Sequence, residues 1–320
     1  METLPLSASP SDVAQPGVTP PPSRRRWLQL VIVGLLFVAV VITFGRGWSE
    51  LSEYHWKVDH TAVILALGLW ALTSLGAGAC WLVVTYAFGV RLPFGPAMRV
   101  FCTSNLGKYL PGKVLHVFAR VYLVQQQGVP VAVGTTSTML DVLLYIAAGL
   151  VLSVFALPTA LGGYQPGIML TAGAAVLVGF ALLHPRVLNA VLAGAARFVP
   201  RLRGLTFELR YASILGAFSL YLLLWLVVTA AVYVGVRSVA FVPLDKAPVL
   251  GAIFAFSYIT GLITPTPAGV GGREAAMAWL FASTGYMSFP AAVVATILNR
   301  LLQVAAEAIC AGFFSVLARR

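Results

Sequence analysis

The stretch TPTPAGVGGRE, residues 264–274, lies between two long apolar segments near the end of the chain. Its two prolines end a helix, because proline lacks a backbone N–H and clashes with the preceding turn. Its three glycines free the backbone from the usual limits on conformation. The adjacent Arg273 and Glu274 then bring two charges into an apolar region. The stretch predicts a deliberate break in a helix, with a polar environment around it.

Composition places that break in a membrane. The chain has 320 residues, of which 59% are hydrophobic and 10% are charged. Its mean hydropathy is +0.90. Several apolar runs approach the roughly 20 residues that a helix needs to cross a bilayer. We therefore expect an all-α polytopic membrane protein with about eight transmembrane or re-entrant segments.

The basic balance of the chain points to lipid rather than to nucleic acid. The formal net charge is +11, and most cations fall in a few connecting segments. Such clusters control topology and attract anionic lipids. Three cysteines are scattered singly and the four histidines form no cluster. We expect no disulfide, no metal site, no cofactor and no nucleic-acid partner.

Hydropathy divides the chain into a tail and one domain. Residues 1–23 are rich in proline, serine and threonine and are expected to be disordered. Residues 24–320 form a single integral membrane domain. Full crossings are expected at 27–45, 62–88, 132–157, 168–184, 212–236 and 290–316. Cations gather before the first of these, after the second and fourth, and at Arg319 and Arg320. This alternation predicts a multi-pass protein of the cell membrane (inner or plasma) with both termini in the cytoplasm.

Two apolar segments remain, at 97–127 and 247–286, and each is interrupted by a Gly/Pro break. Each is either a re-entrant hairpin or a pair of short tilted crossings. The halves 27–157 and 168–316 then share one order of elements with opposite orientation. Broken segments at matching positions of inverted repeats are typical of transporters, and the breaks indicate the substrate site.

Two motifs carry a family resemblance: NLGKYLPGK (105–113) with Arg120, and TPTPAGVGGREAA (264–276) with LNRLL (298–302). In this order they resemble the lysylphosphatidylglycerol synthase transmembrane-region family, from about residue 27 on. The resemblance implies a flippase-like domain that moves lipids between leaflets. The resemblance also implies a link, known for some stand-alone members, to polyprenyl-lipid, hopanoid or glycan pathways. Since the chain ends at Arg320, we expect no aminoacyl-transferase domain and no enzyme activity.

Three functions therefore stay open. The first is a transporter or flippase for an anionic or polyprenyl-type lipid. The second is a non-catalytic membrane partner of a lipid or glycan biosynthesis complex. Expected partners are membrane lipids, with either a biosynthetic membrane protein or a second copy of the chain as the protein partner. The third is an intramembrane lipid transferase, which is disfavoured because no acidic catalytic motif appears in the sequence.

The second break supplies the first head-group candidates, Arg273 and Glu274. Glycines before a helix start leave N–H groups free for an anion, and an arginine suits a phosphate. The structural alternative is an internal salt bridge, with Glu274 favoured at a helix N-terminus. The residues expected to break the helix are Pro265, Pro267, Gly269, Gly271 and Gly272.

The first break supplies a matching set. Lys108, Tyr109, Lys113 and Arg120 are candidate head-group ligands, and Pro111 and Gly112 are the expected breakers. The two lysines are placed to flank one phosphate. Their alternative role is the ordinary positive charge of a cytoplasmic interface.

Two expected crossings each carry a buried charge at matching depth, Asp141 and Arg300. We expect them to approach each other or to share a water-filled site. Gln303 and Glu307 lie on the face of Arg300. The group serves either to stabilise the bundle or to couple transport to protons. Separately, residues 186–210 predict a basic amphipathic helix on the inner leaflet.

Overall fold

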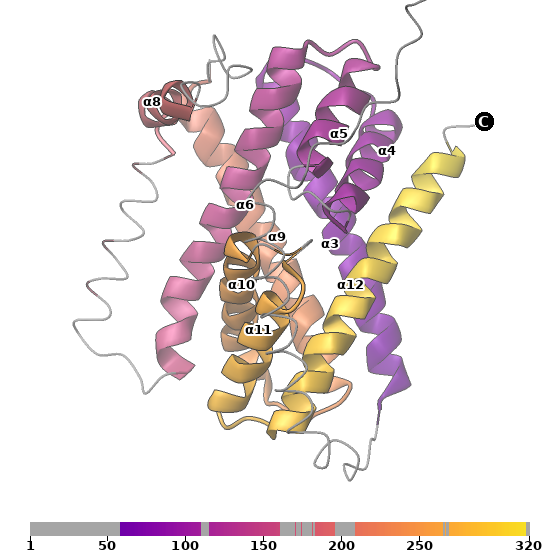
Figure 1. Cartoon of the computed structure of the whole chain (residues 1–320), viewed down its shortest axis with the longest axis vertical. Coiled ribbons are helices and arrows are strands. Elements are labelled where there is room, and N and C mark those ends of the chain that lie inside the picture. Colours follow the sequence, from indigo (N-terminus) through magenta and orange to yellow (C-terminus); the bar gives the residue numbers. More distant parts are fainter. Residues whose placement is uncertain are drawn as a thin grey trace, which may run out of the picture.

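A computed structural model describes residues 58–109, 115–160, 183–195, 209–264 and 269–317, with Leu170, Ala174, Ala181 and Thr266 as single positions. Within these residues every regular element is a helix (Figure 1). Five helical stretches are long and apolar enough to cross a membrane: His60–Ala87, Val131–Ala156, Tyr211–Arg237, Leu244–Ile263 and Phe289–Leu317. The expectation of an all-α polytopic membrane protein is confirmed.

Four predicted crossings are found as single helices. They are α3 (His60–Ala87), α6 (Val131–Ala160), α9 (Tyr211–Arg237) and α12 (Phe289–Leu317). Asp59 begins the first of them, because its carboxylate accepts the backbone N–H groups of Thr61 and Ala62 at 2.9 and 3.1 Å. The predicted tail and the predicted crossing 27–45 lie outside the described residues, as does most of 168–184.

Two hairpins contain the short helices, although the first arm of the second hairpin, Leu244–Ile263, is long enough to cross a membrane. The first comprises α4 (Phe94–Asn105), η1 (Leu106–Tyr109) and α5 (Leu115–Gln125). The second comprises η3 (Leu244–Lys246), α10 (Ala247–Ile263) and α11 (Gly272–Ser283). Helices of 11 or 12 residues, such as α4, α5 and α11, are only about 18 Å long, whereas the hydrocarbon core is about 30 Å thick. In Figure 1 the first hairpin lies in the upper half and the second in the lower half.

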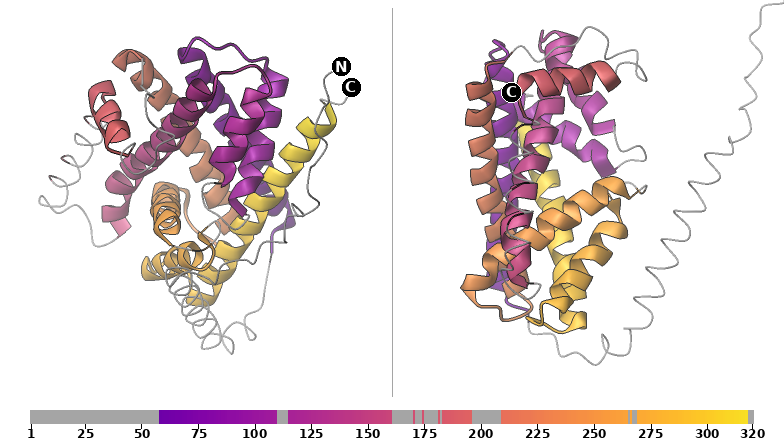
Figure 2. Two further views of the ribbon diagram at one scale, coloured as in Figure 1. Left: turned by 45° about the horizontal axis from the view of Figure 1, so that its top comes forward. Right: turned by 90° about the vertical axis from the view of Figure 1, so that its left-hand side faces the viewer.

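Helix packing repeats between the halves. The arms of each hairpin pack on each other, α4 on α5 and α10 on α11. The second arm then packs on the next long helix, α5 on α6 and α11 on α12. The first arm reaches the other half, so that α4 packs on α12 and α10 packs on α6. Helices α3 and α9 pack together between the halves (Figure 2). Every one of these contacts has its counterpart, as an inverted repeat requires.

Large aromatic side chains fill the centre of the bundle. Trp70 and Trp225 are almost fully buried and both pack on Phe254, with ring centres 5.2 and 6.2 Å apart. Because Phe254 lies on α10, this contact fixes the first arm of the second hairpin against α3 and α9. The hairpin is thereby held by the core and does not stand alone in lipid.

A separate short helix, α8 (Pro185–Ala195), runs across the direction of the long helices (Figure 2). It is the first part of the predicted amphipathic segment 186–210, whose residues 196–208 lie outside the described part of the chain. The helix is confirmed there, and its position on a membrane surface stays a prediction.

Candidate functional site

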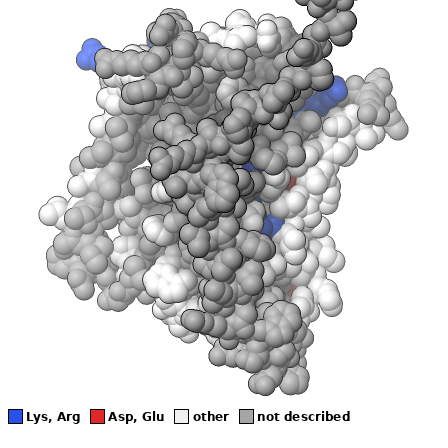
Figure 3. Space-filling model, viewed as in Figure 1, with Lys and Arg blue, Asp and Glu red and all other residues white. Residues whose placement is uncertain are grey.

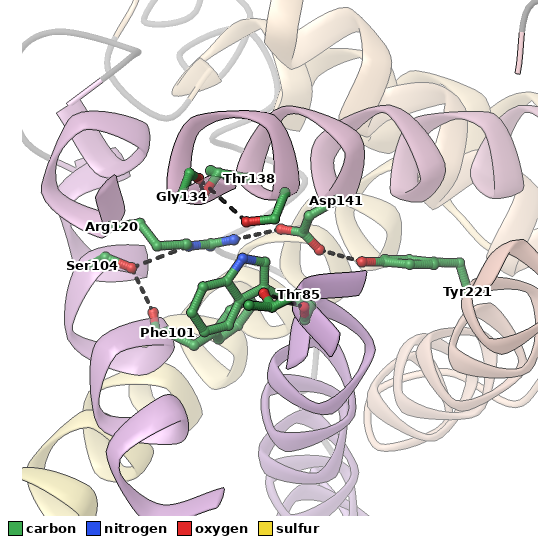
Figure 4. Close-up of polar contacts among 10 residues, drawn as sticks. Thr85, Phe101, Ser104, Arg120, Gly134, Thr138, Asp141 and Tyr221 are labelled. Carbon is green, nitrogen blue, oxygen red and sulfur yellow. Dashed lines mark hydrogen bonds and ion pairs between the residues drawn. The ribbon is translucent and has the colours of Figure 1, made fainter. Parts of the chain in front are cut away.

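The first hairpin buries Arg120 of α5 in a complete set of partners (Figure 4). Its side chain is 2% exposed, and its Nη1 lies 2.5 Å from Oδ2 of Asp141 on α6. Its Nε donates to Ser104 Oγ at 3.3 Å, and its Cζ lies 4.2 Å from the ring centre of Phe101. The hydroxyl of Tyr221 donates to the other oxygen of Asp141. The guanidinium and the carboxylate therefore neutralise each other inside the bundle.

The second hairpin buries Arg273 of α11 without such a set. The residue is 5% exposed, and its Cζ lies 4.4 Å from the ring centre of Phe254 and 5.2 Å from that of Tyr258. Among the described residues, no carboxylate or hydrogen-bond acceptor contacts its guanidinium. A buried charge that lacks a partner is costly. The guanidinium donors of Arg273 are therefore available to an anion.

Two glycines place Arg273 against α10. Gly269 has a φ of +70°, and a Cβ there would lie 2.6 Å from the Cα of Gly261. A Cβ on Gly261 would in turn lie 3.2 Å from the Cβ of Arg273. The two arms meet backbone to backbone, which only glycine allows. Gly271 and Gly272 complete the turn and begin α11.

Glu274 stabilises the start of α11 and does not contact Arg273 as an ion pair. Its Oε2 accepts the backbone N–H of Gly271 at 2.7 Å. Its Oε1 lies 3.4 Å from Nε of Arg300 on α12. These contacts agree with the structural alternative for Glu274, which was an internal salt bridge at a helix N-terminus. The cation of that salt bridge is Arg300.

The first break is held to α12 by Glu307. Nζ of Lys108 lies 2.7 Å from Glu307 Oε1, and the hydroxyl of Tyr109 donates to Oε2 at 2.9 Å. Nε2 of Gln303 also donates to Glu307, at 3.3 Å. The guanidinium of Arg300 lies 5.4 Å from the ring centre of Tyr109. Lys108 is therefore already paired and is not a free phosphate ligand.

The predicted contact between Asp141 and Arg300 is replaced by two others. Asp141 takes Arg120 and Tyr221, whereas Arg300 forms an ion pair with Glu274. The physical reason is local: each long helix packs on the second arm of its own hairpin, so its charge meets that arm first. The prediction that Gln303 and Glu307 share a face is in keeping with their hydrogen bond.

Two adjoining cavities separate the hairpins. The first chamber, of about 80 Å³, is lined by residues of both halves, including Ser74, Asp141, Tyr145, Gln303 and Glu307. The second chamber, of about 90 Å³, is lined by Gly261, Leu262, Gly269, Arg273 and Arg300, with the four shared residues. Asn105, Lys108, His116 and Tyr258 line both chambers. Each volume admits several water molecules.

Charged residues line the two chambers of a chain in which only 10% of the residues are charged. Figure 3 shows a few blue and red atoms at mid-height, beside white ones, and further blue atoms near the top of the molecule. Lys113, Pro111, Gly112, Pro265 and Pro267, which were predicted to belong to the site, lie outside the described residues. The remaining predicted residues lie at the two breaks, on the hairpin arms or on the helices that flank them.

Several contributors were not predicted. Phe101, Phe254 and Tyr258 stack on the two arginines, and Ser104 and Tyr221 complete the network of Asp141. Aromatic residues are frequent in this chain, so their spacing gave no signal. One feature of the sequence could have indicated them: each hairpin carries an arginine on its second arm. An arginine stacks favourably on an aromatic ring, so an aromatic residue on the facing first arm is a reasonable expectation.

A comparison with known families gives one result. The family model described as Lysylphosphatidylglycerol synthase TM region matches residues 27–309. The match includes both hairpins and every described residue that lines the two chambers. A search among curated proteins finds no match.

Proposed function

We propose, from the premise that this chain belongs to the lysylphosphatidylglycerol synthase TM region family, that it moves an anionic lipid between membrane leaflets. The phosphate of the head group occupies the second chamber, and the acyl or polyprenyl tails stay in the bilayer. Membership of the family supports a lipid-related function within the membrane. The movement itself is our proposal.

One observation carries the proposal, the buried guanidinium of Arg273 without a carboxylate. Among the described residues, three cations line the second chamber: Lys108, Arg273 and Arg300. Glu307 neutralises the first and Glu274 the third. Arg273 leaves a surplus of one positive charge, which a phosphodiester with one negative charge would balance.

The arrangement of the hairpins supports a path across the membrane. They approach the chambers from opposite ends of the bundle (Figure 2). In an inverted repeat, rocking one half against the other exposes a central site alternately to each side. We place the protein in a cell membrane with both termini on the cytoplasmic side. In this orientation the first hairpin faces the cytoplasm and the second faces outward.

Leaflet-resolved transport in proteoliposomes tests the proposal. Vesicles containing the purified chain receive fluorescent phosphatidylglycerol, and a membrane-impermeant quencher reports the outer fraction over time. We expect protein-dependent movement that Arg273→Gln abolishes, because glutamine cannot bind a phosphate as a cation. Arg99→Gln, which changes an exposed arginine on α4, is the matched control and should transport normally.

Two outcomes would contradict the proposal. Normal transport by Arg273→Gln would remove the head-group site. No movement of any anionic lipid by folded protein would favour the alternative of a non-catalytic partner in a biosynthetic complex.

A further inference from the structure

The first chamber contains buried polar atoms without partners. Ser74 and Gln303 are 6% and 7% exposed, and both line this chamber. Within the described residues, neither Ser74 Oγ nor Gln303 Oε1 has a partner at an ordinary hydrogen-bond distance. Ser74 does interact with the thiols of Cys102 and Cys310, but a thiol is a weak hydrogen-bonding group. Buried polar atoms normally find partners, so these two indicate a ligand or ordered water.

The charged groups of the same chamber are already engaged. Arg120 and Tyr221 hold Asp141, and Lys108 and Tyr109 hold Glu307. An ammonium group entering the chamber would find no free carboxylate among these residues. A second phosphate would meet two carboxylates at close range. The vacant contacts therefore suit an uncharged group that both donates and accepts hydrogen bonds.

Hydroxyl-bearing rings line the passage between the chambers. Tyr145 lines the first chamber and Tyr258 lines both, and their ring centres lie 5.2 Å apart. No hydrogen bond of either hydroxyl is found within the described residues. Since Tyr258 also stacks on Arg273, a phosphate bound there is adjacent to the first chamber.

We propose that the first chamber is a polyol subsite, which binds an uncharged hydroxylated head group while its phosphate binds Arg273. The inference rests on the proposed function and specifies its substrate class: a phosphodiester of glycerol or of a sugar. Gln303 Oε1 of α12 accepts a hydrogen bond from a hydroxyl group of the lipid, and Ser74 Oγ of α3 donates or accepts another. Lipids whose head group carries an ammonium are disfavoured, because the carboxylates are engaged.

Short-chain lipids that differ only in the head group test the subsite. The full chain in detergent is titrated with dioctanoyl phosphatidylglycerol, phosphatidylinositol, phosphatidylmethanol and phosphatidylethanolamine, and the midpoint of thermal unfolding reports affinity. Phosphatidylmethanol carries the same single charge as phosphatidylglycerol but no hydroxyl. Two additional hydrogen bonds should make phosphatidylglycerol bind about 5- to 30-fold tighter than phosphatidylmethanol. Phosphatidylethanolamine should bind no tighter than phosphatidylmethanol.

Two variants locate the effect. Ser74→Ala should lower the affinity for phosphatidylglycerol towards that for phosphatidylmethanol, without changing the latter. Ser257→Ala is the matched control, because this buried serine only donates to the carbonyl of Ile253 within α10. If Ser74→Ala fails to fold, the comparison of the four lipids with the unmodified chain still tests the polyol subsite.

The outcomes separate the two proposals. Equal binding of phosphatidylglycerol and phosphatidylmethanol, abolished by Arg273→Gln, would overturn the polyol subsite and leave the proposed function intact. Tighter binding of phosphatidylethanolamine would also overturn the subsite. Binding that does not depend on Arg273 would overturn both proposals.

Discussion

The two hairpins bury their arginines in the same way and leave them in opposite states. Arg120 stacks on Phe101 at 4.2 Å, and Arg273 stacks on Phe254 at 4.4 Å, each on the first arm of its own hairpin. Arg120 then meets Asp141. Arg273 shares its chamber with another cation, Arg300.

The difference arises on the long helix that follows each hairpin. Helix α6 supplies a carboxylate and α12, its counterpart in the repeat, supplies a guanidinium. The arginine of the first hairpin is therefore paired with a carboxylate, and within the described residues the arginine of the second hairpin is not. Under the proposed function, this difference between counterpart helices separates a structural arginine from an anion-binding one.

Removing the carboxylate of the first hairpin should have the largest effect. Asp141→Ala leaves Arg120 buried without its counter-ion and should lower the free energy of unfolding by about 3–5 kcal/mol. Arg273→Gln breaks no ion pair and should cost far less. Unfolding in mixed micelles titrated with sodium dodecyl sulfate measures both. Equal losses would mean that both arginines are structural.

Glycine contacts between the arms provide the second test. Gly269→Ala adds a methyl group 2.6 Å from Gly261 Cα at a φ of +70°, and should cost about 2–4 kcal/mol. Gly107→Ala in the first hairpin meets His116 backbone at 3.2 Å and should cost less. Gly285→Ala, with a φ of +72° and open space, isolates the conformational cost in the same unfolding assay. If Gly285→Ala costs as much as Gly269→Ala, the close contact contributes nothing.

Placing a carboxylate in the second hairpin should make it resemble the first. Arg300→Glu brings an acidic side chain to the chamber of Arg273, where it competes with phosphate for the guanidinium. Affinity for dioctanoyl phosphatidylglycerol, measured by thermal shift, should fall about 10- to 100-fold. Arg300→Gln removes the cation without adding a competitor and should lose less. A smaller loss in the glutamate variant would contradict the competition.

The smallest effect is expected at the first break. Tyr109→Phe removes one hydrogen bond to Glu307 and should lower the free energy of unfolding by about 0.5–1.5 kcal/mol. Tyr122→Phe is the control, because this side chain on α5 is 62% exposed. The same loss in the control would show that the contact with Glu307 has no net value.

Much of the framework follows from the sequence. Length and hydropathy place α3, α6, α9 and α12 correctly, because a bilayer imposes one length on every crossing helix. The breaks were also predictable, since proline and glycine act on their own backbone.

The sequence did not predict which charged side chains form ion pairs inside the bundle. Asp141 and Arg300 lie at similar depth, which suggests a pair, but depth alone does not say which helix faces which. The pairs found, Arg120 with Asp141 and Arg300 with Glu274, depend on the packing of each hairpin's second arm. Stacking rings and the unpartnered Ser74 depend on the same tertiary contacts.

Helix α12 serves both hairpins from one side. Arg300 pairs with Glu274 of the second hairpin, and Glu307 two turns later holds Lys108 of the first. Gln303 lies between them on the same face. A rotation of α12 about its own axis would displace both of these ion pairs together. Under the proposed transport cycle, α12 would therefore couple the movements of the two hairpins.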